Sequence, residues 1–247
     1  MVDLLRLEGG GREDKLEELL AWAHRVGCTL DKLRLEYTED RGVRMIATQD
    51  IQPKDQICSI PETLCISVEM GLNTNLAKTW NEAFNSHKCQ GGMNEGLSLA
   101  SNAESSHVIF WLFLSVLRRK FLNRLPKEHE GAEEALKMDL EPYFHALPQT
   151  YSDLMWWSDS ELDLLRPTQI YTNARRARKG LRMIYDQVME YVIPRYRPLK
   201  GLSYDEFKWG WSTHRSRSFG DRKLLRGNQS HFLMPLLDFA NHNASSK

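Results

Sequence analysis

The chain has 247 residues, enough to bury a core in one compact body that carries an insertion. Its 33 basic and 33 acidic residues give a formal net charge of zero, which excludes a global field that recruits nucleic acid or a membrane surface. The hydrophobic fraction of 41% excludes a disordered chain, so we expect an ordinary globular protein.

The cysteines and the N-terminus indicate the compartment. The cysteines form no Cys-x-x-Cys pair and have no histidine at zinc spacing, so the sequence shows no metal motif. They are Cys28, Cys58, Cys65 and Cys89. The acidic N-terminus fits neither a signal nor a transit peptide, and no apolar run approaches the ~20 residues of a membrane span. We expect reduced thiols in a protein of the cytoplasm or nucleus, without a membrane anchor.

The first part of the chain predicts one helix followed by short strands. Leucines at three- and four-residue steps predict an amphipathic helix over 14–26, with Gly27 as its C-terminal cap. Alternation then predicts strands, which turn residues keep short; they cover 33–37, 43–48, 56–60 and 64–66. Several short strands with tight turns favour a small irregular β-sheet over a parallel α/β unit.

From Ser67 the pattern becomes helical. Helices are predicted over 73–84, 108–122, 161–165 and 168–192, with a mobile loop over 90–106 and an extended aromatic segment over 140–151. Ser203 and Glu206 form a capping box that opens a last, aromatic-rich helix. No fixed-period repeat is visible, so a solenoid is not expected.

A basic cluster lies on the longest predicted helix. It consists of Arg175, Arg176, Arg178 and Lys179. We interpret it as a solvated helix face, with contact to an acidic partner as the alternative. Nucleic-acid binding through this cluster is disfavoured, because the net charge is zero and the chain contains no recognised module.

Separated motifs then occur in a definite order. The N-terminal one runs from Arg41-Gly42-Val43 to Asp50-Ile51 and is followed by Ile60-Pro61. A Pro-Tyr and a Leu-Pro-x-x-Tyr lie within 141–151. Arg215-Ser216-Arg217-Ser218-Phe219 comes next, and an apolar run ends in Asp238-Phe239-Ala240-Asn241-His242. This order resembles the SET-domain protein methyltransferases, in the group that includes Rubisco large-subunit methyltransferase and actin-histidine methyltransferase.

The resemblance implies a fold and an activity. The fold is α+β: a β-rich SET core, split by a long helical insertion. We expect an N-terminal helical segment over 1–30, SET core over 31–70, the insertion over 71–202, and an incomplete second part of the core over 203–247. The activity is methyl transfer from S-adenosylmethionine to a lysine (or histidine) side chain of a protein substrate. In-line methyl displacement requires alignment of donor and acceptor and needs no metal.

The resemblance also assigns residues by position. Arg41, Gly42, Val43, Asn241 and His242 match cofactor-binding positions, and glycine lets a backbone approach a ligand closely. Arg217 and Asp238 match the substrate-nitrogen end. Taken singly, Arg41-Gly42 is an ordinary turn and His242 an ordinary core histidine. Arg217 is equally consistent with a structural ion pair to Asp238, since buried arginines need a partner.

The sequence departs from the family pattern in two ways. Arg44 stands where a second glycine is usual, and Arg41 replaces an acidic residue, so either cation could narrow the pocket or change its charge. The tyrosine that orients the amine in the family would lie beyond Lys247, so we expect a C-terminally truncated member with its catalytic residue unassigned. The alternative is a non-catalytic SET-like module that binds a protein partner. The target protein, the number of methyl groups and the oligomeric state stay open.

Overall fold

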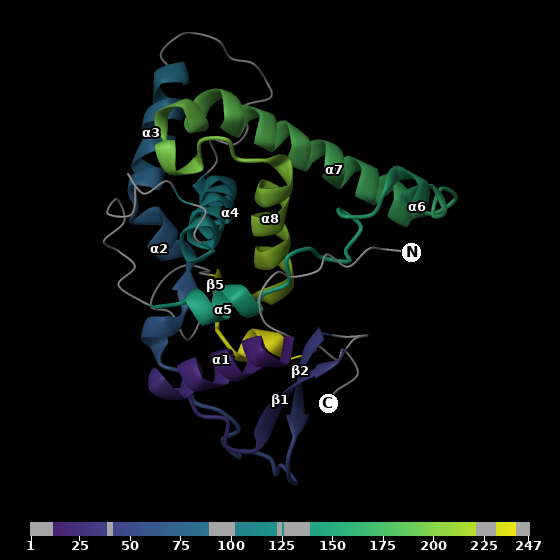
Figure 1. The fold of residues 1–247 in the computed structure, drawn as a ribbon. Coiled ribbons are helices and arrows are strands. Elements are labelled where there is room, and N and C mark those ends of the chain that lie inside the picture. Colours follow the sequence, from purple (N-terminus) through teal and green to yellow (C-terminus); the bar gives the residue numbers. More distant parts are fainter. Residues whose placement is uncertain are drawn as a thin grey trace. The chain divides into compact units, whose positions relative to one another are not determined.

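The computed structural model describes residues 12–38, 42–88, 102–122, 125, 139–220 and 231–240 (Figure 1). These residues divide between two compact units. Unit 1 combines Met1–Ile66, Met138–Leu147 and Leu233–Lys247. Unit 2 combines Ser67–Lys137 and Pro148–Phe232. These units are defined by packing, so the predicted domain boundaries at 30, 70 and 202 stay a prediction.

Unit 1 begins with helix α1 (Arg12–Arg25), as the leucine spacing predicted. It packs against α5 (Glu141–Ala146), and the fully buried Trp22 donates its indole N–H to the carbonyl of Asp139. Gly27 ends the helical region with φ of +86°, a conformation that only glycine adopts without strain. The predicted glycine cap is therefore confirmed.

A two-stranded antiparallel sheet follows, formed by β1 (Leu33–Thr38) and β2 (Gly42–Ala47). The register pairs Leu33 with Ala47 and Thr38 with Gly42. Leu35 is buried, whereas its strand neighbours are more exposed, so the alternation that predicted a half-buried strand is confirmed.

Three predicted segments of unit 1 are wrong. In place of the predicted strand 56–60 there is a single bridge between Thr29 and Ser59. In place of the predicted strand 64–66 there is a 3-10 turn, η1 (Glu62–Leu64), which starts after Pro61 and is followed by the short strand β3 (Ile66–Ser67). The aromatic segment predicted to be extended forms helix α5 instead. Proline is tolerated in a first helical turn, where its missing N–H costs nothing.

Unit 2 is organised around α4 (Asn102–Phe121), which packs against α2 (Val68–Leu72), α3 (Asn75–Lys88) and α8 (Tyr204–Arg217). The helix is buried on nearly all sides, and its least exposed side chains are Phe110, Leu112, Phe113, Leu114 and Leu117. It starts before the predicted boundary, so 102–106 are helical and not a loop; residues 89–101 lie outside the described residues.

Helices α4 and α8 approach closely because α8 carries Gly210 at their contact. A Cβ added there would lie 2.3 Å from the carbonyl oxygen of Trp111. The buried Arg119 of α4 makes two hydrogen bonds of 2.8 Å to the carboxylate of Glu206 on α8. The predicted capping box of Ser203 and Glu206 is present.

The remaining elements of unit 2 are shorter or more exposed. They are α6 (Asp159–Asp163), α7 (Gln169–Gln187), the π-helical turn η4 (Val188–Val192), and the 3-10 turns η5 (Ile193–Arg195) and η6 (Arg197–Leu199). Strands β3, β5 (His231–Leu233) and β4 (Ser218–Gly220) form a small sheet in the order β3-β5-β4; β3 and β5 each include one residue assigned to unit 1.

Candidate functional site

The predicted cofactor strand and the predicted C-terminal motif meet within unit 1. Gly42 and Val43 lie in β2, and Asp238 lies in the 3-10 turn η7 (Leu237–Phe239), which packs against β2. We call Gly42, Val43 and Asp238 the β2–η7 site. Arg41, Asn241 and His242 lie outside the described residues, so their predicted roles stay predictions.

The pairing of β1 and β2 determines which backbone groups face away from β1. Thr48 donates its N–H to the carbonyl of Lys32 at 3.0 Å, one step beyond the Leu33–Ala47 pair. Lys32 and Thr48 therefore form a hydrogen-bonded pair, and every second pair along an antiparallel ladder is of this kind. Thr38 and Gly42 are such a pair, so the N–H and C=O of Gly42 point toward β1. The N–H and C=O of Val43 therefore point to the opposite edge, where β2 has no paired strand among the described residues.

The cation at Arg44 has an acidic partner, which it shares with a second arginine. Its guanidinium lies 3.0 Å from the carboxylate of Glu36, the residue opposite it on β1, and Glu36 also pairs with Arg34. Side chains of adjacent strand residues lie on opposite faces, so Arg44 and Val43 do not share a face. The charge of Arg44 is thus paired with Glu36. Whether the Arg44 side chain narrows the pocket stays a prediction.

The turn before Asp238 is strained. Leu236, which is fully buried, has φ of 72° and ψ of −52°, the conformation of a rare γ-turn. A non-glycine residue held there costs on the order of 1–3 kcal/mol, and such strain persists where the surrounding structure over-determines it. The turn is followed by a hydrogen bond from the N–H of Asp238 to the carbonyl of Met234.

Asp238 is buried, and a tyrosine holds its carboxylate. The hydroxyl of Tyr143 donates to Oδ2 of Asp238 at 2.8 Å, and its ring packs edge-on against Phe239. Tyr143 has no exposed surface. Sequence reasoning noticed the Pro142-Tyr143 pair as part of a motif but gave the tyrosine no role. Its contact with a residue 95 positions away is a tertiary feature.

Arg217 belongs to unit 2, at the end of α8. Because Asp238 belongs to unit 1, the predicted ion pair between them stays a prediction. The same helix end carries Ser216, whose hydroxyl donates to the carbonyl of Ser212 at 2.7 Å. Ser218 likewise donates to the carbonyl of His214 at 2.6 Å, which holds the segment Arg215–Ser218 against the last helical turn.

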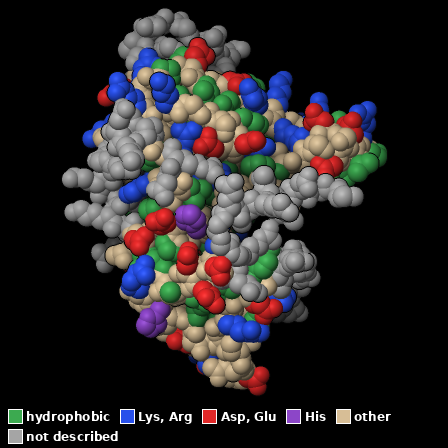
Figure 2. Space-filling model, viewed as in Figure 1, with side chains coloured by type: hydrophobic (Ala, Val, Ile, Leu, Met, Phe, Trp, Pro, Cys, Tyr) green, Lys and Arg blue, Asp and Glu red, His purple; other side chains and the backbone are tan. Residues whose placement is uncertain are grey.

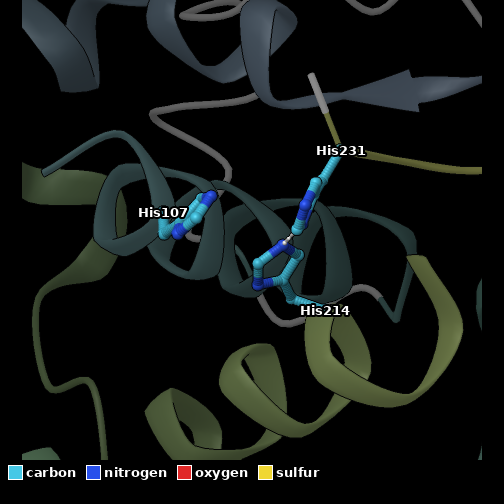
Figure 3. A group of neighbouring side chains, drawn as sticks. All are labelled: His107, His214 and His231. Atoms are coloured by element: carbon cyan, nitrogen blue, oxygen red, sulfur yellow. Dashed lines mark hydrogen bonds between the residues drawn. The ribbon is translucent and has the colours of Figure 1, made fainter. Parts of the chain in front are cut away.

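Unit 2 also contains a group of side chains that sequence reasoning missed. His107 of α4, His214 of α8 and His231 of β5 converge, and we call them the three-histidine cluster (Figure 3). Nε2 of His214 lies 2.8 Å from Nδ1 of His231, and Trp111 donates its indole N–H to Nδ1 of His214 at 2.9 Å. Burial, then nearby His107, His231 and Arg215, lower the pKa of His214 to about 3.

The basic cluster of α7 is partly engaged. Arg178 donates to the carbonyls of Leu154 and Trp157 and pairs with Asp159, whereas Arg175, Arg176 and Lys179 are exposed. Acidic and basic side chains both occur over α6 and α7 (Figure 2). This mixture fits the solvated face that the sequence favoured.

The fold and the β2–η7 site define the class: the chain has the fold of a SET domain. It aligns over 94% of its length with the SET domain of LSMT bound to methyl-lysine and AdoHcy, with a TM-score of 0.68, 19% identity and 46% coverage of that chain. It also aligns with Rubisco LSMT bound to AdoMet, with a TM-score of 0.65, 19% identity, and coverage of 93% of this chain and 45% of that one. The predicted α+β fold is confirmed.

The curated relatives are protein methyltransferases. Actin-histidine N-methyltransferase from Gallus gallus is 21% identical over 244 residues, which cover 94% of this chain and 35% of the relative. The chloroplastic large-subunit N-methyltransferase of ribulose-1,5 bisphosphate carboxylase/oxygenase from Nicotiana tabacum is 32% identical over 104 residues, covering 41% of this chain and 20% of the relative. The predicted resemblance to this group is confirmed. No protein-family profile matches the chain.

Within the described ranges, no helix is both long and apolar enough to cross a membrane.

Proposed function

We propose that this chain carries the cofactor-binding core of an S-adenosylmethionine-dependent protein methyltransferase. The observation that carries the proposal is the packing of β2, with Gly42 and Val43, against η7, with Asp238. Two motifs almost 200 residues apart in the sequence thereby meet within one compact unit. The SET fold and the activities named for the relatives support the same reading.

The β2–η7 site fits the chemistry of the cofactor. S-adenosylmethionine supplies a methyl group on a sulfonium, and its amino-acid end presents an ammonium and a carboxylate. The outward edge of β2 offers the N–H and C=O of Val43, one donor and one acceptor for these groups. Glycine at position 42 leaves room for close approach of a ligand to this backbone. Arg41, Asn241 and His242 complete the proposed cofactor set.

The substrate end is assigned to Arg217 and Asp238. A methyl acceptor must present a deprotonated nitrogen in line with the donor, so positioning dominates the catalysis. Tyr143 fixes the carboxylate of Asp238, which leaves the adjacent backbone in a defined orientation. We propose a lysine or a histidine side chain of a protein as the acceptor, because the relatives act on Rubisco and on actin histidine.

The enzyme assignment is tested by methyl transfer. The chain is incubated with S-adenosylmethionine labelled on the methyl group and with actin or the Rubisco large subunit, and the label is located by mass spectrometry. We expect methyl transfer by the wild type and a rate at least tenfold lower for an Asp238→Asn variant. The enzyme assignment would be contradicted if neither this chain nor a version extended with the downstream segment of a relative transferred the label.

A non-catalytic SET-like module is the second candidate. It is favoured by the departures from the family pattern at Arg41 and Arg44, which place two cations in the predicted cofactor motif. Such a module would bind a protein partner without transferring methyl groups. Pull-down of a partner by both wild type and the Asp238→Asn variant, with no label transferred, would select it.

We also propose that the protein works in the cytoplasm or nucleus, which rests on the absence of paired cysteine motifs in the sequence. A tagged chain should distribute diffusely between these compartments. Recovery in the secreted fraction would contradict this.

A further inference from the structure

The three-histidine cluster brings together imidazoles from three elements of unit 2. His107 lies in the first half of α4, His214 in the last turn of α8 and His231 at the start of β5 (Figure 3). One ring nitrogen of each lies within 4.8 Å of the others. The rings of His107 and His231 are stacked with centroids 5.1 Å apart, and that of His214 is 5.0 Å from both.

We propose that the three-histidine cluster is a binding site for one divalent transition-metal ion, with Zn²⁺ as the probe of choice. Neutral imidazole suits zinc, copper and nickel, and three histidines with an open fourth position are a known zinc arrangement. None of the three histidines belongs to the β2–η7 site or to the residues proposed for the substrate end.

The geometry is close to that of a bound ion. Zinc–nitrogen bonds of about 2.0–2.1 Å at a tetrahedral angle place the nitrogens about 3.3 Å apart. Nε2 of His214 and Nδ1 of His231 are 2.8 Å apart and share a proton. Metal binding therefore replaces that proton and requires these two nitrogens to separate by about half an ångström. The three ligand nitrogens now lie within 4.8 Å of one another, so the His107 nitrogen must approach the others by up to about 1.5 Å, a movement that side-chain rotation can supply.

Access and burial also fit. His214 is 3% exposed, and its ring packs against those of Phe110 and Trp111, which restricts its orientation. His107 and His231 are only half-buried, which leaves a route for an ion from solvent. A metal ligand must be neutral, and the hydrogen bond from Trp111 requires an unprotonated nitrogen on His214.

The same hydrogen bond from Trp111 to His214 must break when the metal binds, so it lowers the affinity for the metal. The indole of Trp111 is only a donor, so Nδ1 of His214 accepts, and the single proton of the neutral ring sits on Nε2. Coordination through Nε2 would move this proton to Nδ1, where it faces the indole N–H. One buried hydrogen bond is lost, which raises the dissociation constant for the metal by about 5- to 150-fold. Trp111 therefore acts as a competitor of the metal.

The experiment measures Zn²⁺ affinity of the full chain by competition with a chromophoric chelator. Wild type should bind one Zn²⁺, and Co²⁺ added instead should give the visible absorption of a tetrahedral site. His107→Ala and His231→Ala should each weaken binding by about 100-fold or more, the loss of one ligand. His24→Ala, an exposed histidine of α1, is the matched control and should bind as wild type does.

Trp111→Phe separates the proposal from adventitious binding. It keeps an aromatic ring but removes the competing donor, so affinity should rise by about 5- to 150-fold. Circular dichroism confirms that each variant is folded. Affinity that is unchanged in His107→Ala and His231→Ala would overturn the proposal. So would a Trp111→Phe protein that binds no Zn²⁺ or binds it no more tightly than wild type.

Discussion

The β2–η7 site and the three-histidine cluster are built in opposite ways. The first uses backbone groups of a strand edge and one buried carboxylate, and its residues sit in short motifs. The second uses only side chains, brought together by the packing of α4 against α8 and by β5. The first therefore depends on local sequence, whereas the second depends on helix packing. Substitutions should affect them separately.

The largest effect is expected at Gly210, which sets the distance between α4 and α8. Gly210→Ala places a methyl group 2.3 Å from the carbonyl oxygen of Trp111, so the helices must separate. We expect a loss of about 3 kcal/mol in the free energy of unfolding by urea. Zn²⁺ binding should weaken, because Trp111 and His214 lie on these two helices.

The matched control is another helical glycine. Gly180 of α7 has no neighbour within 4 Å of an added Cβ. Gly180→Ala should stabilise the protein by about 0.5–1 kcal/mol through helix propensity. Equal stability of the two alanine variants would show that the α4–α8 contact is less tight than described.

Glu206 should make the same helix pair acid-sensitive. Burial alone would raise its pKa, but hydrogen bonds from Arg119 and Ser203 outweigh burial and lower the pKa to about 2. Because the folded pKa lies below the unfolded one, this stabilisation is complete above about pH 4.5 and is lost as the pH falls toward 2.

Glu206→Gln measures this contribution. At pH 7 it should cost about 2–3 kcal/mol of unfolding free energy, and the difference from wild type should shrink as the pH falls from 4.5. Urea unfolding of both proteins at several pH values checks it. A difference that is constant with pH would contradict the ionic role of Glu206.

A smaller effect is expected at Tyr143 in unit 1. Tyr143→Phe removes the hydroxyl that donates to the buried Asp238 and should cost about 1–2 kcal/mol in unfolding free energy. Because Asp238 is proposed for the substrate end, methyl transfer should also fall, while Zn²⁺ affinity stays unchanged. Tyr151→Phe in unit 2, which removes a hydroxyl bonded to Thr213, should spare methyl transfer. Equal methyl transfer by both variants would remove Tyr143 from the site.

The smallest effect is expected at Arg44. Its pair with Glu36 is partly exposed, so Arg44→Ala should cost only about 0.5 kcal/mol. Cofactor affinity should change little, because Arg44 and Val43 lie on opposite faces of β2. An increase of tenfold or more in calorimetric affinity would show instead that this arginine narrows the pocket.

Local features were predictable from the sequence, and tertiary ones were not. The capping box of Ser203 and Glu206 and the glycine cap at Gly27 are signals within one turn, so α8 and α1 were found. Helix α5 was missed because the two prolines among the aromatic side chains of 140–151 favoured an extended segment, although the first helical turn tolerates proline.

The candidate sites show the same division. Gly42, Val43 and Asp238 were predicted from ordered motifs, and the structure places their elements together. The role of Tyr143 and the meeting of His107, His214 and His231 could not be predicted, because side chains so distant in sequence are joined only by packing. The expectation of no metal site rested on cysteine and histidine spacing, which carries no information on such a group.

The most direct test of the central claim is calorimetric binding of S-adenosylmethionine to this chain. We predict one site per chain, competed by S-adenosylhomocysteine, with an affinity at least tenfold lower in Val43→Pro. That variant removes the outward-facing N–H of β2 and blocks this edge with the proline ring, without removing a hydrogen bond to β1. Absence of binding by the folded wild-type chain, or equal affinity in the Val43→Pro protein, would contradict the account.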